Sequence, residues 1–397
     1  MIDTRAVATV LLVLSAMSAG SSRSAAEVVE FTYTNSYDGT EQKAVAYVPE
    51  VCKQRESSPL IAVAHPGGGD RHSPSYYYAE CEARGWLYVC PDLHGPDIDG
   101  RSCYAVLEAQ HDMVDAVQYM REHYGVDPAR IYIAGRSMGG SVAAVTAAKY
   151  PDLFAAAMGG QGIYDMRSRN AGRGYEALGG PYTPERRFVY ERYSAVSFAR
   201  NFRYVPLILW HGTNDAVVRP EQSERMVSAI RQHHRFQPDV HWLLAAPHSP
   251  INFPPAWILD QLEHYQNVDD ANEVPRFFLE LDLVTDEAKS FFWLHITPAR
   301  SDAFAQVRAS VKDDVLSIRS IEAAQVKVDL TNMPPWVTLS RYDIRSSRPL
   351  QVTVVENGRT LFSADIHGAR AGPLPKASAG QIIPPPQDLS DRPRLES

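Results

Sequence analysis

Residues 28–266 alternate short apolar segments with segments whose apolar residues recur at helical spacing. Several of the apolar segments are continuous, such as LIAVA at 60–64 and PLILW at 206–210, as expected for strands that are covered on both faces. The spacing predicts strands at 30–35, 43–48, 60–64, 86–90, 131–134, 155–158, 207–210 and 240–244, and helices at 104–123, 137–149, 220–232 and 257–265. This alternation predicts an α/β domain with a mostly parallel sheet flanked by helices, which we place at 27–268.

The pattern changes after about residue 273, where short strand-like segments are separated by polar turns and no strong helical spacing remains. The segment ENGRT at 356–360 predicts a hairpin, because Asn-Gly fits the left-handed positions of a tight turn. We expect a small all-β sandwich at 273–370. The Pro-rich stretch at 371–397 is too poor in apolar residues to build a core and is predicted to be a disordered tail.

The first residues have the layout of a secretory signal peptide, which we place at 1–26. Arg5 precedes an apolar run at 6–14, and small residues follow through Ser18, Ala19 and Gly20. Cleavage after Ala19 fits this pattern, with Ala26 as the alternative. The run is shorter than the roughly 20 residues that a membrane span needs, and no other segment is a candidate, so we expect a secreted or periplasmic protein without a membrane span.

The composition indicates a globular protein and argues against a nucleic-acid partner. Of the 397 residues 45% are hydrophobic and 22% are charged, which is typical of a globular protein with a real core. The formal net charge is −8, the opposite of what a phosphate-neutralising surface needs, and we therefore expect no nucleic-acid partner.

The four cysteines are an even set, Cys52, Cys81, Cys90 and Cys103, without the C-x-x-C spacing of a zinc or redox site. Four cysteines allow three pairings, and sequence alone does not choose among them. In the predicted sheet the first two lie toward the bottom and the last two toward the top. This placement favours disulfides Cys52–Cys81 and Cys90–Cys103.

The strongest chemical signal is GRSMG at 135–139, which lies between the strand segment RIYIA and the helical segment SVAAVTAAKY. G-x-S-x-G at a strand-to-helix turn is typical of a nucleophilic serine, because the turn lifts the hydroxyl above the sheet and requires small neighbours. Ser137 is therefore the candidate nucleophile.

A serine nucleophile needs a base and an orienting carboxylate, which in this topology follow later in the chain, acid first. Asp215 lies in the loop after the strand PLILW, and His248 lies just after the next strand. A turn residue and a solvated loop histidine are the structural alternatives. His233, His234 and His241, and Asp239 and Asp260, are weaker candidates from their places in the predicted elements.

An oxyanion hole is the remaining requirement, and backbone N–H groups supply it. One donor is predicted to be Met138, next to the nucleophile. The other is predicted in the loop HPGGG at 65–69, where Pro66 has no N–H, so that Gly67, preferred over Gly68, is the candidate.

The stretch 45–265 resembles α/β-hydrolase esterases of the prolyl oligopeptidase-like and polyhydroxybutyrate-depolymerase-like families. The phrases that carry the resemblance are YVPE, LIAVAHPGGG, YVCPDLHG, DPARIYIAGRSMGGSVA and LILWHGTNDAVV. It implies an α/β-hydrolase fold with Ser137 as nucleophile, Asp215 as acid and His248 as base. Pro66 departs from the His-Gly usual in such proteins. The β-propeller that precedes the catalytic domain of prolyl oligopeptidases is not expected here, which favours an esterase over a peptidase.

A predicted insertion at 161–201 is rich in Arg and Tyr, including Tyr164, Arg167, Tyr190 and Arg192. Two interpretations stay open: a lid that binds aryl, sugar or acidic groups, or a helical cover with solvated arginines. Asp92, Asp97 and Asp99 in PDLHGPDIDG fit consecutive turns better than a calcium site. We expect neither a metal nor a cofactor.

These observations together predict a secreted serine esterase that acts on small-molecule or polysaccharide esters, with acetyl or feruloyl groups as candidates. A prolyl oligopeptidase-like serine peptidase is one alternative. The other is a catalytically inactive module in which the β-domain binds carbohydrate or a partner.

Overall fold

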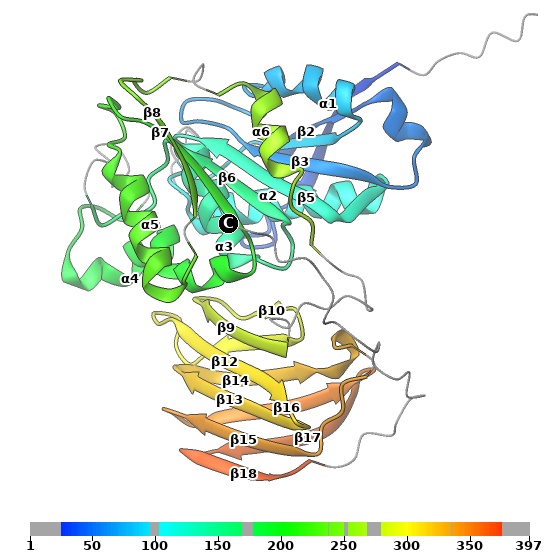
Figure 1. Ribbon diagram of the computed structural model, residues 1–397, viewed down its shortest axis with the longest axis vertical. Helices are drawn as coiled ribbons and strands as arrows, with labels where there is room; N and C mark the ends of the chain where they lie inside the picture. Colours follow the sequence, from blue (N-terminus) through cyan, green and yellow to red (C-terminus); the bar gives the residue numbers. More distant parts are fainter. Residues whose placement is uncertain are drawn as a thin grey trace, which may run out of the picture.

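The computed structural model describes residues 25–95, 103–168, 178–236, 238–249, 253–267, 279–334 and 336–374. The chain forms an α/β unit followed by a β-sandwich, which lies below it in Figure 1. The predicted signal peptide lies outside the described residues except for residues 25 and 26, and the predicted domain boundary near 268–273 lies outside them as well. None of the helices in the described ranges is long and apolar enough to cross a membrane.

The α/β unit is built on an eight-stranded sheet in the order β1-β2-β4-β3-β5-β6-β7-β8. β1 and β2 pair antiparallel, as do β2 and β4, and the other neighbours are parallel. The strands are β1 (Glu27–Thr34), β2 (Glu41–Val48), β3 (Ser58–Ala64), β4 (Leu87–Pro91), β5 (Val126–Arg136), β6 (Ala156–Gly160), β7 (Leu207–Gly212) and β8 (Asp239–Leu243). This arrangement confirms the predicted α/β-hydrolase fold.

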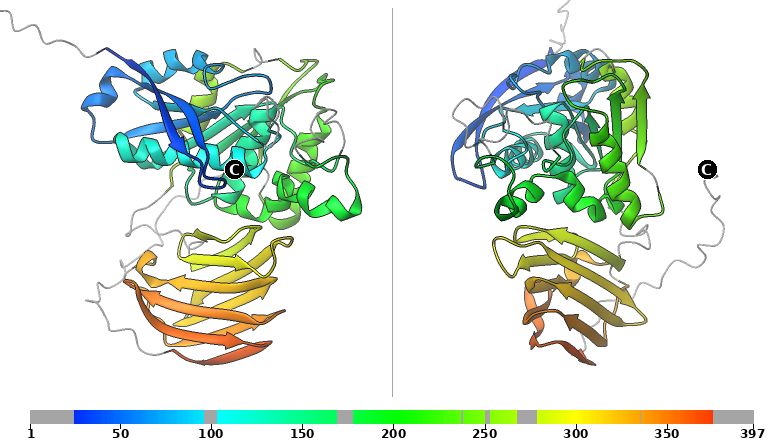
Figure 2. Two further views of the ribbon diagram at one scale, coloured as in Figure 1. Left: turned by 180° about the vertical axis from the view of Figure 1, so that it is seen from behind. Right: turned by 90° about the vertical axis from the view of Figure 1, so that its left-hand side faces the viewer.

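Helices cover both faces of this sheet (Figures 1 and 2). The apolar side chains of α2, α3 and α5 share one core cluster with one face of the strands, and those of α1 and α6 share another with the opposite face. The helices are η1 (Glu50–Gln54), η2 (Ser75–Tyr77), α1 (Tyr78–Arg84), α2 (Leu107–His123), α3 (Met138–Lys149), η3 (Pro184–Arg186), α4 (Arg187–Arg192), η4 (Ala195–Arg203), α5 (Glu221–His233) and α6 (Pro255–Leu262).

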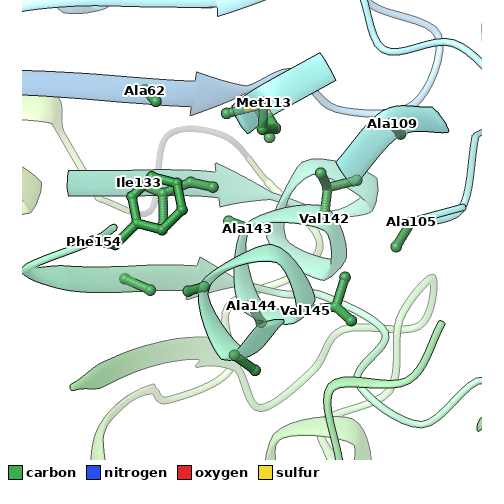
Figure 3. Packing of buried hydrophobic residues seen from close by; sticks show 14 of the residues in the cluster. Ala62, Ala105, Ala109, Met113, Ile133, Val142, Ala143, Ala144, Val145 and Phe154 are labelled. Carbon is green, nitrogen blue, oxygen red and sulfur yellow. The ribbon is translucent and has the colours of Figure 1, made fainter. Parts of the chain in front are cut away.

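Helix α3 is the most deeply placed helix, since every one of its residues is buried. Its small and β-branched side chains let it lie close to the strands, with Val142 and Ala143 near Ile133 of β5 (Figure 3). Because α3 begins directly after Ser137, this packing fixes the position of the candidate nucleophile.

The C-terminal unit consists of two five-stranded sheets with one apolar core, which confirms the predicted all-β sandwich. Their orders are β10-β11-β14-β16-β17 and β18-β15-β13-β12-β9. The elements are β9 (Glu280–Thr285), β10 (Lys289–Phe291), β11 (Leu294–Pro298), β12 (Ala305–Lys312), β13 (Val315–Ile321), β14 (Ala323–Asp329), η7 (Leu330–Asn332), β15 (Arg341–Ser346), β16 (Leu350–Glu356), β17 (Arg359–Ile366) and β18 (Ala369–Pro373). The sandwich thus extends past the predicted end at 370, and residues 375–397 lie outside the described range.

The two units meet where β9 and the turn after it pack against η4, α3 and α4. Asn201 closes part of this contact: its Nδ2 donates to the Val284 carbonyl at 2.9 Å, and its Oδ1 accepts from the Val284 N–H at 2.9 Å. Lys149, at the end of α3, contacts Asp286 and Glu287 across the same junction. The junction is therefore polar as well as buried.

The cysteine prediction is corrected, because all four side chains are buried free thiols in the structure. Cys90 belongs to the core cluster on the α1–α6 face of the sheet, whereas Cys103 belongs to the cluster on the α2–α3 face. The sheet therefore separates the two sulfur atoms. Cys52 and Cys81 lie near enough for Cys52 to act electrostatically on Cys81, but both are free thiols; burial raises the pKa of both, which disfavours the thiolate that exchange requires.

Candidate active site

Ser137 occupies a strained turn between β5 and α3. Its φ of +58° and ψ of −124° lie in a region that non-glycine residues rarely adopt. A Cβ at Gly135 would lie 2.2 Å from the Gly139 carbonyl oxygen, and one at Gly139 would lie 2.1 Å from that of Ala64. Glycine is therefore required on both sides of the serine, and the two positions explain how GRSMG folds into this turn.

Asp215 follows β7 and is 4% exposed. Its Oδ1 accepts hydrogen bonds from the N–H groups of Val217 and Val218, both at 2.9 Å. Burial raises the pKa of this carboxyl, but hydrogen bonds from His211, His248 and Val218 outweigh burial and hold the pKa well below its usual value. Asp215 therefore carries a negative charge at neutral pH and can orient and stabilise a charged imidazole.

His248 lies between the carboxylate and the serine. Its Nδ1 is 2.7 Å from Oδ2 of Asp215, and its Nε2 is 3.0 Å from Oγ of Ser137. Because an ionised carboxylate only accepts, Nδ1 carries the proton and Nε2 is free to accept the hydroxyl proton of the serine. The structure thus brings together the three side chains singled out in the sequence.

Backbone contacts hold the loops that carry these side chains. The Asn214 N–H donates to the Ala246 carbonyl at 3.0 Å, and Nε2 of Gln161 donates to the Pro247 carbonyl at 3.0 Å. A Cβ at Gly212 would lie 2.3 Å from the Ala246 carbonyl oxygen, so that the loops after β7 and β8 approach closely only with glycine there. Gln161 and Gly212 thus support the position of His248.

His211 is a residue of the site that the sequence analysis did not single out. It is wholly buried, its Nδ1 is 2.8 Å from Oγ of Ser223, and its Nε2 is 2.8 Å from the Val218 carbonyl and 3.4 Å from Oδ2 of Asp215. His211 therefore ties the Asp215 loop to β7 and α5. A polar residue at the end of the otherwise apolar run PLILW was the available signal.

The two proposed oxyanion donors lie where the sequence predicted them, at the start of α3 and in the loop after β3. Met138 is the first residue of α3, where backbone N–H groups have no partner within the helix. Gly67 is exposed in a turn that the Gly69 N–H closes onto the Pro66 carbonyl at 3.0 Å. His65 shapes this loop: its Nε2 accepts from the Leu93 N–H at 3.1 Å, and burial lowers its pKa, which keeps it neutral. The role of the Gly67 N–H stays a prediction.

The weaker candidates have other partners. His241 contacts Asp239 at 3.0 Å, Asp260 contacts Arg84 at 2.5 Å, and Nε2 of His234 is 3.0 Å from the Ala199 carbonyl. None of these contacts involves Ser137.

The insertion at 161–201 contains residues 169–177, which lie outside the described range. In the described part, Tyr164 and Tyr190 are buried, Arg167 contacts Asp165 and Glu191, and Arg192 contacts Asp286. These contacts favour a structural cover for the described part, but Arg167 and Arg192 are paired with carboxylates and not merely solvated as that interpretation expected.

The acidic loop after β4 is only partly described, since Asp97 and Asp99 lie outside the described ranges. Asp92 contacts Arg71 at 2.7 Å. Among the described residues no group of three or more His, Cys, Asp or Glu side chains is arranged to hold a metal ion.

Two curated proteins are similar to part of this chain. Feruloyl esterase B of Talaromyces funiculosus is 27% identical over 195 residues, and feruloyl esterase B of Talaromyces stipitatus is 28% identical over 196 residues. In both cases the match covers 43% of this chain and 52% of the relative, so that the chain spans about half the length of these curated relatives.

A solved structure described as a putative dipeptidyl aminopeptidase IV from Bacteroides ovatus matches 60% of this chain and 35% of its own chain, with a TM-score of 0.50 and 17% identity, which supports the fold. The model of the prolyl oligopeptidase family matches residues 70–268, half of the chain, including Ser137, Asp215 and His248. The chain therefore belongs to the prolyl oligopeptidase family.

Proposed function

We propose that this protein hydrolyses carboxylic esters through an acyl-enzyme, with Ser137 as nucleophile, His248 as general base and Asp215 as the orienting acid. The observation that carries the proposal is the continuous relay of 3.0 Å from serine to imidazole and 2.7 Å from imidazole to carboxylate. A serine hydroxyl becomes nucleophilic when a base at this distance accepts its proton.

In the proposed reaction the Oγ of Ser137 attacks the ester carbonyl carbon while its proton passes to Nε2 of His248. The N–H groups of Met138 and Gly67 receive the negative oxygen. The imidazolium, stabilised by Asp215, then protonates the leaving alcohol and an acyl-serine remains. A water molecule, deprotonated by the same imidazole, releases the acid and restores the serine.

One observation supports an ester rather than a peptide substrate. Both curated relatives bear the name feruloyl esterase B, although they share only about half of their length with this chain. That name supports feruloyl esters as a substrate class, and the predicted export suggests feruloyl or acetyl esters of polysaccharides. A serine peptidase of the same family is the alternative, because the same relay cleaves amides.

A panel of substrates distinguishes an esterase from a peptidase. The purified chain and a Ser137→Ala variant are assayed on methyl ferulate, p-nitrophenyl acetate and amino-acyl p-nitroanilides, prolyl derivatives included. We expect ester hydrolysis that disappears in the variant, with little cleavage of the anilides. Efficient anilide cleavage without ester preference would favour the peptidase, and full activity of Ser137→Ala would end both proposals.

We also propose export from the cell, which rests on the apolar run at 6–14 and the small residues after it. N-terminal sequencing of protein from the medium or periplasm should find a start shortly after residue 19 or 26. A start at Met1 in the cytoplasm would contradict it.

A further inference from the structure

A narrow pocket of about 20 Å³ lies beside the candidate nucleophile. Pro66 lies at one side of it, at the loop proposed to carry an oxyanion donor, and Gly135 and Arg136 of β5 lie at another. Tyr76, Trp210 and Phe253 supply aromatic walls. Tyr76 is 52% exposed, so this wall borders solvent. A volume of this size holds about one water molecule, so the pocket can receive only the end of a substrate group while the reacting carbonyl lies outside it at Ser137.

Arg136 brings a positive charge to this pocket without a partner for it. Among the described residues no carboxylate forms an ion pair with its guanidinium, and its Nε is buried without a hydrogen bond. Two other partly buried arginines of the same unit are paired with carboxylates: Arg71 contacts Asp92 at 2.7 Å, and Arg84 contacts Asp260 at 2.5 Å. Arg136 differs from these two in having no carboxylate partner.

An unpaired and partly buried guanidinium is costly, because it loses water without gaining an acceptor. Burial lowers the pKa of Arg136, while the charges of Tyr76 and Asp215 act against burial. The guanidinium nevertheless stays protonated, as arginine does in proteins. Asp215 does not neutralise it by contact, since that carboxylate is occupied by His248, His211 and two backbone N–H groups. A residue that costs stability beside a reactive group is typical of a binding site.

We propose that Arg136 binds a carboxylate of the substrate, so that the preferred esters are anionic. The inference rests on the proposed function and specifies its substrate class. A guanidinium presents paired N–H groups that match the two oxygens of a carboxylate, and the exposed ring of Tyr76 at the pocket can contact the carbon frame that joins this carboxylate to the ester.

Matched substrate pairs test the inference. The first pair carries the charge on the acyl side: the mono-p-nitrophenyl ester of glutaric acid against p-nitrophenyl valerate. The second carries it on the alcohol side: 4-acetoxybenzoate against its methyl ester. For each pair, the ratio of kcat/KM for the anionic and neutral ester is compared between wild type and Arg136→Gln. This comparison cancels the intrinsic reactivity of the esters.

We expect the ratio to fall about 10- to 100-fold in Arg136→Gln for the pair whose carboxylate reaches the guanidinium, as for the loss of a charged hydrogen-bonded partner. Arg136→Lys keeps the positive charge but loses the paired N–H groups, and its ratio should lie between those of the wild type and Arg136→Gln. Arg235→Gln, which removes an exposed charge elsewhere in the domain, is the control and should leave the ratio unchanged. Because Arg136 has no partner to lose, Arg136→Gln should melt no lower than wild type.

Unchanged ratios for both pairs, with ester hydrolysis intact, would overturn the inference and leave the proposed function standing. Binding of benzoate and of neutral benzamide to the Ser137→Ala protein, by calorimetry, provides a readout without turnover. Should no ester be hydrolysed, preference for benzoate that is lost with Arg136→Gln would support the anion site alone. Equal binding of both probes in that case would overturn the site as well.

Discussion

Replacing Lys149 by Met should weaken the junction between the α/β unit and the sandwich. Lys149 is 1% exposed, and its Nζ lies 2.8 Å from Oδ1 of Asp286 and 2.9 Å from Oε2 of Glu287, both in the turn between β9 and β10. Asp286 is held additionally by Arg192 at 3.0 Å, and Glu287 has Lys289 at 3.8 Å. The substitution therefore leaves the buried Asp286 with Arg192 and the partly buried Glu287 with the more distant Lys289 as their remaining lysine or arginine partners.

The expected loss in the free energy of unfolding follows from these ion pairs. Removing one partner of a buried ion pair costs about 3–5 kcal/mol when the remaining charge is left alone. Arg192 and Lys289 still neutralise part of the charge here, so we expect the lower end, about 3 kcal/mol. With a urea m-value of about 3 kcal/mol per molar, the first unfolding midpoint should fall by about 1 M.

Urea unfolding followed by fluorescence measures this midpoint at neutral pH. The matched control is Arg187→Met, because Arg187 also pairs with a carboxylate, Glu191 at 2.8 Å, but its side chain is 66% exposed. Such a surface pair contributes about 0.5 kcal/mol or less. A Lys149→Met midpoint no lower than that of the control would refute the reasoning that the junction depends on buried charge.

Two further predictions concern the site and its surroundings. Asp215→Asn places an amide group where Oδ2 accepts from Nδ1 of His248, which favours the histidine tautomer with its proton on Nε2. The kcat on esters should therefore fall on the order of 10³–10⁴-fold, while circular dichroism shows an intact fold. A loss of kcat below about tenfold would contradict this. His94 contacts Asp112 at 2.8 Å and Asp38 at 3.0 Å; burial lowers its pKa, but these partners outweigh burial and raise it to about 9. Because the folded pKa lies above the unfolded value of about 6.5, the stabilisation is full below pH 6.5 and is lost as pH rises through 9. Urea midpoints between pH 7 and 10 should show this loss in the wild type and a smaller one in His94→Asn, and equal losses would contradict it.

The parts of the fold and site that the sequence predicted depend on short stretches of apolar, polar and glycine residues. The buried strands, the turn around Ser137 and the loops that carry Asp215 and His248 each follow from apolar runs that end in glycine or polar residues. Because the carboxyl ends of parallel strands share one edge, their order along the chain was enough to bring these loops together.

The features that the sequence did not reveal depend on which face or neighbour a side chain meets. Cys90 and Cys103 both lie toward the top of the predicted sheet, which favoured a pair, but β4 directs Cys90 to the face opposite Cys103. Lys149 is the last residue of α3, and a lysine at the end of a helix is usually solvated. Only the contact with the sandwich shows that this lysine is buried. The G-x-S-x-G pattern assigns no role to Arg136, and its missing partner is visible only in three dimensions.

Covalent labelling of Ser137 tests most directly that this serine is activated by His248. The full chain is treated with a fluorophosphonate, and the modified residue is located by peptide mass spectrometry, in parallel with Ser137→Ala and His248→Ala. We expect one label on Ser137 in the wild type, none there in Ser137→Ala, and labelling slowed on the order of 10³-fold or more in His248→Ala. An unlabelled wild-type serine, or a rate unaffected by loss of the imidazole, would contradict the proposed relay.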